Sequence, residues 1–206
     1  MKMRLALGLA ALALIATPAV AGKKQAQADA DWWARLSSSK PDDISDLIGV
    51  VDDPMETFVR VDSRAVYQAQ NMEGGVSKAD SYLIAEIDRK TGQATYTYVF
   101  HAVYSARSGF RLVRMNAEGP EGAVPLDMVN LPGDVDGCQR YGCLFAMEAH
   151  AIVPRAVLDY AAAKPADSPW KMRLAFDGGH GDRETAPVEV AAFLAKVDAV
   201  TAQLAR

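Results

Sequence analysis

Glu148 and His150 lie two residues apart in a segment that alternates apolar and polar residues in the manner of a β-strand. Residues at this spacing point to the same face of a sheet, so the carboxylate and the imidazole would be neighbours. Such a pair could transfer protons as general acid and base, or provide two ligands to a metal ion. His101 is a further candidate for the same site. The commoner alternative is that both side chains form the solvated face of a strand whose other face is apolar.

Asp177, His180 and Asp182, with Glu184 close behind, form a second group whose side chains suit a divalent cation. Glycine-rich acidic segments are also ordinary hairpin connections, and this one matches no ion-binding loop pattern. We therefore predict a turn at residues 177–182, and expect neither a metal nor another cofactor.

A stripe of aromatic residues could bind a sugar or an apolar ligand by stacking. If residues 93–104 form one strand, the stripe lies on a single face of it. If a helix covers this face, the same stripe is part of the core. Only the exposure of these side chains would distinguish a ligand site from core packing. The stripe comprises Tyr96, Tyr98, Phe100 and Tyr104.

Cys138 and Cys143 are the two cysteines of the chain, and four residues separate them. This spacing suits a tight hairpin, in which facing Cα atoms about 4.5 Å apart are within reach of a disulfide. The spacing is not the C-x-x-C of redox sites, and two ligands are too few for structural zinc. We predict a structural disulfide worth roughly 2 kcal/mol. Arg140 and Tyr141 at the hairpin tip are of types enriched at interfaces, although an exposed loop is the simpler explanation.

The first 21 residues have the three parts of a secretory signal peptide. Lys2 and Arg4 precede an apolar run over residues 5–15, and Ala19-Val20-Ala21 provides a small-residue cleavage site. The apolar run is shorter than the roughly 20 residues that a membrane-spanning helix needs. No cysteine that could carry a lipid follows the cleavage site. We therefore expect a protein exported to the periplasm, or beyond the cell, without a transmembrane anchor after cleavage.

The remaining chain is acidic and long enough for one domain. The signal segment takes two of the 22 basic residues and none of the 26 acidic ones, which leaves a net charge of −6. This charge, without a local basic cluster, argues against a nucleic-acid partner. Nucleophile elbow, P-loop and dinucleotide-binding patterns are missing from the sequence. We expect a flexible leader at residues 22–28 and a single domain at 29–206.

Hydrophobic periodicity predicts the elements that would position these residues. Apolar residues at helical spacing predict short helices near residues 32–36, 41–51 and 154–164, and a C-terminal amphipathic helix over 187–204 with Thr185 as its cap. Period-two alternation predicts strands over residues 56–68, 81–88, 93–104, 110–115, 144–153 and 170–176, with an irregular one within 124–131. The fold expected is α+β: a twisted, meander-like antiparallel sheet of about six or seven strands, covered by the C-terminal helix and pinned by one disulfide hairpin.

Several short motifs occur in a characteristic order from about residue 50 onward. They are Asp52-Asp53-Pro54, Asp88-Arg89-Lys90-Thr91-Gly92, Tyr104, and Cys138 with Tyr141-Gly142-Cys143 and Glu148. This succession resembles a group of small exported bacterial proteins of unknown function. A more distant similarity is to the invasion-associated locus B family, in which a Cys…Gly-Cys strand also precedes a short helix, a strand and a C-terminal helix. The first resemblance implies no activity, and the second implies a role in host interaction.

The signal segment, the cystine-pinned β domain, the acidic charge and the missing catalytic motifs together favour one functional hypothesis. It is a non-enzymatic periplasmic binding or envelope-accessory protein, whose partner would be an envelope protein or a small ligand. One alternative is a hydrolase or metal-dependent enzyme that uses Glu148 and His150, which requires that these side chains share a face of the sheet. The other alternative is a host-interaction factor.

Overall fold

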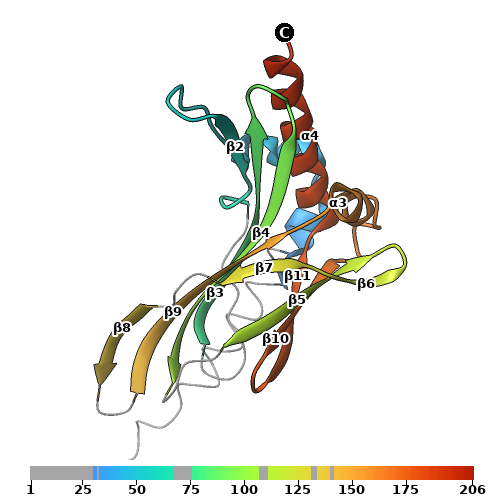
Figure 1. Cartoon of the computed structure of the whole chain (residues 1–206). Coiled ribbons are helices and arrows are strands. Elements are labelled where there is room, and N and C mark those ends of the chain that lie inside the picture. Colours follow the sequence, from blue (N-terminus) through green and yellow to red (C-terminus); the bar gives the residue numbers. More distant parts are fainter. Residues whose placement is uncertain (1–29, 32, 67–75, 107–110, 131–133, 140–141) are drawn as a thin grey trace, which may run out of the picture.

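The computed structural model describes residues 30–31, 33–66, 76–106, 111–130, 134–139 and 142–206. The predicted signal segment, the leader, Trp32, Arg140 and Tyr141 lie outside these residues. In the described ranges the chain is α+β, as predicted, with two antiparallel sheets and helices packed against them (Figure 1).

The N-terminal part is helical at residues 33–38 and continues into α2 (Pro41–Ile44) and the 3₁₀-helix η1 (Ser45–Leu47). Helical spacing predicted one helix to residue 51, but the chain becomes a strand, β1 (Gly49–Val51). Glycine weakens a helix and the two valines favour extended backbone, so the segment Gly-Val-Val ends the helix early.

The larger sheet, in the described residues, has seven strands in the order β1-β2-β3-β4-β9-β7, and β8 also pairs with β9. Its strands after β1 are β2 (Phe58–Asp62), β3 (Val76–Asp88), β4 (Ala94–Ala106), β7 (Asp127–Asn130), β8 (Asp134–Gln139) and β9 (Gly142–Ile152). The predicted hairpin between β3 and β4 is confirmed, with Gly92 at a φ of 68° in its turn. Only glycine adopts such a φ without steric cost.

A second sheet, which the sequence did not predict, contains four strands among the described residues. They are β5 (Leu112–Gly119), β6 (Gly122–Pro125), β10 (Trp170–Phe176) and β11 (Gly179–Thr185). The segment of β11 contains two glycines and four charged or histidine side chains, so it lacks the apolar alternation that marks a strand. Its pairing with β10 comes from tertiary structure. Thr185 therefore ends a strand, and Ala186 is the N-cap of the last helix.

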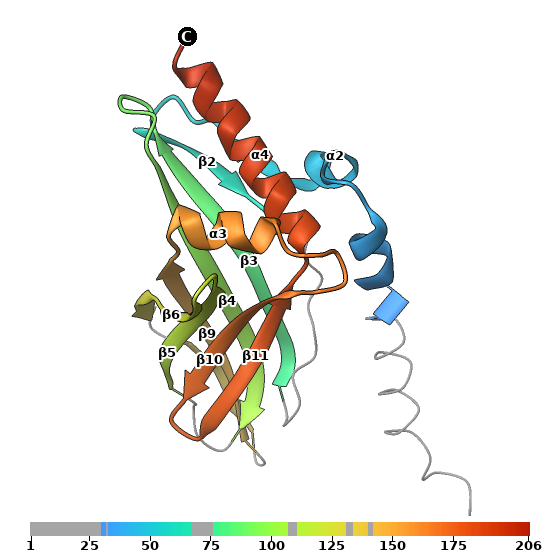
Figure 2. The same cartoon turned by 90° about the vertical axis from the view of Figure 1, so that its right-hand side faces the viewer.

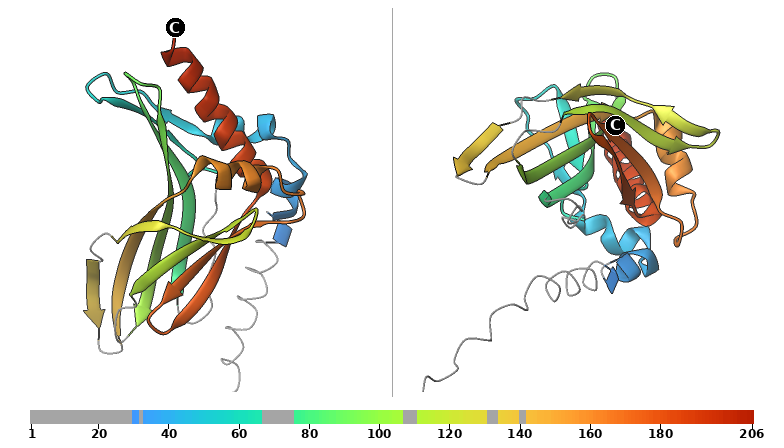
Figure 3. Two further views of the ribbon diagram at one scale, coloured as in Figure 1. Left: turned by 45° about the vertical axis from the view of Figure 1, so that its right-hand side comes forward. Right: turned by 90° about the horizontal axis from the view of Figure 1, so that it is seen from below.

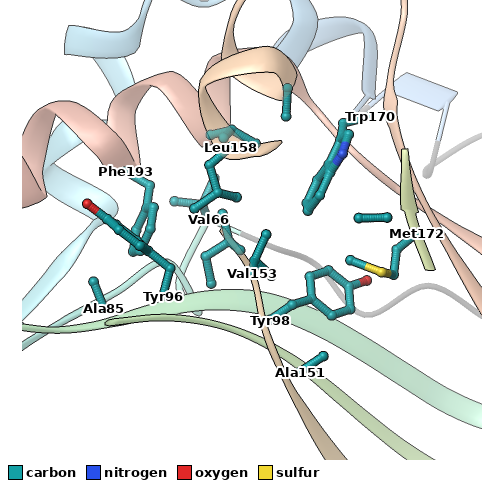
Figure 4. Close-up of a cluster of buried hydrophobic side chains, with 14 of the residues drawn as sticks. Val66, Ala85, Tyr96, Tyr98, Ala151, Val153, Leu158, Trp170, Met172 and Phe193 are labelled. Atoms are coloured by element: carbon teal, nitrogen blue, oxygen red, sulfur yellow. The ribbon is translucent and has the colours of Figure 1, made fainter. Parts of the chain in front are cut away.

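Both sheets and two helices enclose the core. Helices α3 (Arg155–Ala162) and α4 (Pro187–Leu204) lie against one part of the inner face of the seven-stranded sheet, and the four-stranded sheet lies against another (Figures 2 and 3). Tyr98 of β4, Phe193 of α4 and Trp170 of β10 are fully buried between these layers (Figure 4). The prediction that the C-terminal helix covers one face of the sheet is confirmed.

The predicted disulfide is also confirmed. Cys138 of β8 and Cys143 of β9 are register partners, and their Cα atoms lie 3.9 Å apart. None of the helices in the described ranges has the length and apolar character needed to cross a membrane.

Candidate functional site: the open face of the seven-stranded sheet

The strand register places several candidate residues on the sheet face opposite the core, which we call the open face. His101 of β4 pairs with Glu148 of β9, and Val99 pairs with His150. Tyr82 of β3 pairs with Val99 from the other side. Directly opposed residues of paired strands share a face. Glu148, His150, His101 and Tyr82 therefore lie on one face of the sheet.

Glu148 and His150 interact directly. His150 Nε2 lies 2.8 Å from Glu148 Oε1, and each side chain is about one third exposed. An ionised carboxylate can only accept a hydrogen bond, so Nε2 donates and Nδ1 is left as the basic nitrogen of the neutral ring. This is the arrangement of a histidine base oriented by a carboxylate, and it is also an ordinary surface pair.

Tyr82 belongs to a second hydrophobic cluster, separate from the main core, which it forms with Ile84 and Val99. The Arg64 guanidinium lies over the Tyr82 ring, 4.5 Å from its centroid, and donates a hydrogen bond to Tyr82 Oη. Burial raises the pKa of Tyr82, and the charge of Glu148 adds to the rise although Arg64 opposes it. The tyrosine therefore stays a neutral hydroxyl at physiological pH.

Exposed apolar side chains continue the open face beyond this cluster. Val129 of β7 is 61% exposed and pairs with His150. Ile152 of β9, next in line after His150 on this face, is 46% exposed. The open face thus combines a buried apolar centre, exposed aliphatic groups and the Arg64–Tyr82 and Glu148–His150 pairs.

The described residues contain no group of three or more His, Cys, Asp or Glu side chains that could hold a metal ion. Asp182 instead accepts two hydrogen bonds from Arg173, at 2.7 and 2.8 Å, which lower the pKa of its carboxyl. Asp177 Oδ1 accepts a hydrogen bond of 3.3 Å from the backbone amide of Arg111. His180 is exposed on β11. Asp177, His180 and Asp182 are close in the sequence, but in the described residues they do not form a common metal site.

The tyrosine stripe is buried. Tyr96, Tyr98 and Tyr104 are 8%, 0% and 3% exposed. Their rings contact those of Phe193, Trp170 and Phe145, respectively. In this arrangement the stripe is core, and the rings of Tyr96, Tyr98 and Tyr104 are not open for stacking on a ligand.

The motif at the β3–β4 turn has a local structural explanation. Asp88 Oδ1 accepts hydrogen bonds from the amides of Lys90 and Thr91, at 3.0 and 2.7 Å. Arg89 forms an ion pair with Asp52 and donates to the carbonyl oxygen of Asp53 at 2.8 Å. The turn therefore fastens the segment that follows β1 to the tip of the hairpin.

Sequence reasoning missed a buried polar cluster inside the fold. Glu189, in the first turn of α4, is 1% exposed, and its Oε1 accepts a hydrogen bond of 3.0 Å from Ser63 Oγ. Ser63 Oγ in turn accepts one of 3.0 Å from the amide of Leu83. Among the described residues, Glu189 Oε2 has no hydrogen-bond partner. A glutamate at the third helical position is ordinary capping chemistry, so the sequence carries no signal that it is buried.

Two further buried polar groups lie on neighbouring elements. Arg183 of β11 is 4% exposed, and its Nε approaches Ser81 Oγ at 3.4 Å. In the described part of the chain, Tyr98 Oη makes no hydrogen bond of normal geometry, although Ser81 is close enough to affect its ionisation. Burial raises the pKa of Tyr98 to about 12, and the nearby Arg183 charge opposes that rise.

Comparison with known proteins identifies no relative: no protein-family model matches the chain, and no curated protein or solved structure matches it. The resemblances drawn from the short motifs therefore stay predictions.

Proposed function

We propose that the chain is an exported, non-enzymatic accessory protein that binds a partner protein through the open face of its seven-stranded sheet. The observation that carries the proposal is the pair of exposed aliphatic side chains Val129 and Ile152, which lie on the same face as the buried cluster of Tyr82, Ile84 and Val99. Exposed apolar side chains with polar groups around them are typical of interaction sites. Arginine, which occurs here as the exposed Arg64 over the Tyr82 ring, is among the types that most often anchor interfaces.

The export part of the proposal rests on residues 1–21 and on the disulfide, because disulfides persist in oxidising compartments. The test is cell fractionation of the expressed full-length chain, followed by N-terminal sequencing. The expected result is a periplasmic or secreted protein that begins at Gly22. A cytoplasmic protein with residues 1–21 still attached would overturn this part of the proposal.

The binding part can be tested by site-specific photo-crosslinking in intact cells. Val129 and Val113 are both exposed valines, but Val113 lies on β5 of the other sheet. A crosslinking residue at position 129 should capture one discrete partner, and the same residue at 113 should not. Ile152→Glu should abolish the captured product, whereas Val113→Glu should preserve it. The two positions are a matched pair, because the wild-type side chains are 46% and 45% exposed. Equal behaviour of the two sites would refute the open face as the binding surface.

A second candidate function, hydrolysis, is favoured by the 2.8 Å contact between His150 Nε2 and Glu148 Oε1. In this scheme Glu148 orients the imidazole, and His150 Nδ1 takes a proton from an attacking water molecule. Turnover of an envelope-derived ester or amide by the purified protein, lost in Glu148→Gln but retained in Glu86→Gln, would support it. Glu86 is an exposed residue of β3 on the same face and serves as the matched control. Turnover that survives Glu148→Gln would exclude this site.

A further inference from the structure

The edge strand β1 is the outermost strand of the seven-stranded sheet, and among the described residues it pairs only with β2. Val50 shares the inner face with its partner Val61, and Val51 shares the open face with Arg60. Val50 and Val51 are 41% and 58% exposed, so the side chains on both faces of the strand are accessible to solvent. An uncovered edge strand is a template on which another extended chain can pair.

Exposed apolar residues extend this edge on both sides. Leu47, before β1, is 47% exposed, and Met55, after it, is 89% exposed. With Val50 and Val51 they form four exposed large apolar side chains within nine consecutive residues. These four residues are the apolar component of the surface that we call the β1 edge.

Acidic residues are concentrated in the sequence on both sides of β1. Between residues 40 and 59 the sequence holds six acidic residues and a single basic one, Lys40. Asp52 is neutralised by its ion pair with Arg89, and Asp43 accepts a hydrogen bond from the backbone amide of Lys40. Among the described residues, Asp46 and Glu56 form no ion pair. The six are Asp42, Asp43, Asp46, Asp52, Asp53 and Glu56.

These charges decide which occupant fits. A second copy of the chain would bring the same six carboxylates against the first, and like charges at close range oppose association. An anionic lipid surface would be repelled for the same reason. An extended segment that alternates apolar and basic residues would pair with the β1 backbone and bury its apolar groups against Val50 or Val51. Its basic groups would neutralise the acidic residues that flank β1 in the sequence.

We propose that the β1 edge binds an extended, basic segment of a partner protein by strand addition. This mode of recognition takes its affinity from main-chain hydrogen bonds and its selectivity from alternate side chains. In the order of the strands β1 lies at the opposite end of the sheet from β9 and β7, which carry Ile152 and Val129, so each proposal can fail without the other.

The test uses a synthetic peptide, Lys-Val-Lys-Val-Lys-Val-Lys, titrated into the isotopically labelled protein, with Glu-Val-Glu-Val-Glu-Val-Glu as the charge-reversed control. We expect amide shifts at Gly49, Val50 and Val51 with the basic peptide only, and an affinity that weakens as salt is raised. Absence of binding by the basic peptide, equal binding by both peptides, or shifts confined to other strands would overturn the proposal. Concentration-dependent shifts at these amides without peptide would also overturn it, because the occupant would then be a second copy.

Two double variants separate local from global charge. Asp46→Asn with Glu56→Gln should weaken peptide binding by roughly 3- to 10-fold, the range expected for two partly screened surface charges. Glu121→Gln with Asp167→Asn removes the same charge from exposed positions outside the β1 edge and should leave the affinity unchanged. Val51→Lys, which places a like charge on the edge, should abolish binding while the protein stays folded. Equal losses in the two double variants would contradict a local site.

Discussion

At the scale of single residues, Glu189 is the side chain whose chemistry depends most on its surroundings. Its carboxyl is buried where α4 meets the turn after β2, and its only hydrogen bond in the described residues comes from Ser63. Burial raises its pKa to about 8; Ser63 opposes the rise, and the charge of Asp80 adds to it. A neutral carboxyl is therefore the form that this site stabilises.

The raised pKa of Glu189 predicts that the protein loses stability as pH rises from about 4.5 to about 8. A carboxyl whose folded-state pKa exceeds its unfolded-state pKa stabilises the fold fully below the lower value. That contribution falls as pH rises toward the folded-state pKa of about 8. At about 1.4 kcal/mol per pH unit between the two values, the loss is roughly 4 to 5 kcal/mol.

Urea unfolding at a series of pH values checks this prediction. Glu189→Gln, which cannot ionise, should show a smaller decline in the free energy of unfolding from acid to alkaline pH than the wild type. The exposed Glu121→Gln should follow the wild-type curve. Parallel curves for wild type and Glu189→Gln would contradict the assignment of this loss to Glu189.

A second prediction compares two tyrosines of the same strand. Tyr96 Oη accepts a hydrogen bond of 3.0 Å from Arg155 Nη1, whereas Tyr98 Oη has no partner of normal geometry among the described residues. Tyr96→Phe should lower the free energy of unfolding by about 1 kcal/mol, because it removes a hydrogen bond. Tyr98→Phe should be neutral or slightly stabilising, because it removes a buried hydroxyl that nothing compensates. The reverse order in urea unfolding would show that Tyr98 Oη is hydrogen bonded in solution.

At the scale of elements, α3 is fastened to the four-stranded sheet through Glu118. Its carboxylate forms an ion pair with Lys164 and accepts a hydrogen bond of 3.2 Å from Tyr160, and its backbone carbonyl accepts one of 2.8 Å from Trp170 Nε1. Burial would raise the pKa of Glu118, but the contacts with Lys164 and Tyr160 outweigh burial and lower it. The carboxylate is therefore charged across the physiological range.

Replacement of this carboxylate should loosen α3. Because the side chain of Glu118 is 32% exposed, its contacts are partly screened, and Glu118→Ala should cost about 1 to 2 kcal/mol of stability. Hydrogen exchange should accelerate at the amides of α3. Glu121→Ala, in the turn that follows β5, should have no measurable effect. An equal loss in both variants would indicate a general effect on the β5–β6 hairpin.

The sequence predicts elements well where one face of a strand is buried, because burial imposes an alternation that can be read directly. Ala149 and Ala151 of β9, and Val153 directly after it, alternate and are buried, as the pattern indicated. The disulfide was predictable because its spacing is purely local. The second sheet was not, because β11 is stabilised by its partner β10 and its own side chains lack that alternation.

The candidate site was partly predictable for the same reason. The shared face of Glu148 and His150 follows from their spacing. The contact between Tyr82 and Arg64 in the candidate site depends on how a turn and two strands come together in the fold. The sequence carries no signal for that contact. Glu189 escaped notice because a glutamate near a helix start is common on the surface as well.

At the scale of the whole molecule, one contiguous hydrophobic core joins the layers. It includes Ile44 of α2, Leu83 of β3, Leu158 of α3, Leu174 of β10 and Phe193 of α4. Residues of both sheets thus bury their apolar surface against the same neighbours. If one layer unfolded alone, it would expose the apolar side chains of the other layer to water. The described fold should therefore unfold as one cooperative unit.

Trp170 offers the test of this cooperativity. It is fully buried on β10 and its ring meets Tyr98 of the other sheet edge-on, with centroids 6.0 Å apart. Trp170→Ala should lower the free energy of unfolding by roughly 3 to 5 kcal/mol, the usual cost of removing a large buried aromatic side chain. Because that ring bridges the sheets, the transitions followed by far-ultraviolet and near-ultraviolet circular dichroism should shift together. Val113→Ala, at an exposed position of the same small sheet, should shift neither. Two separated transitions in the tryptophan variant would mean that the four-stranded sheet unfolds on its own. In that case the shared core does not couple the two sheets.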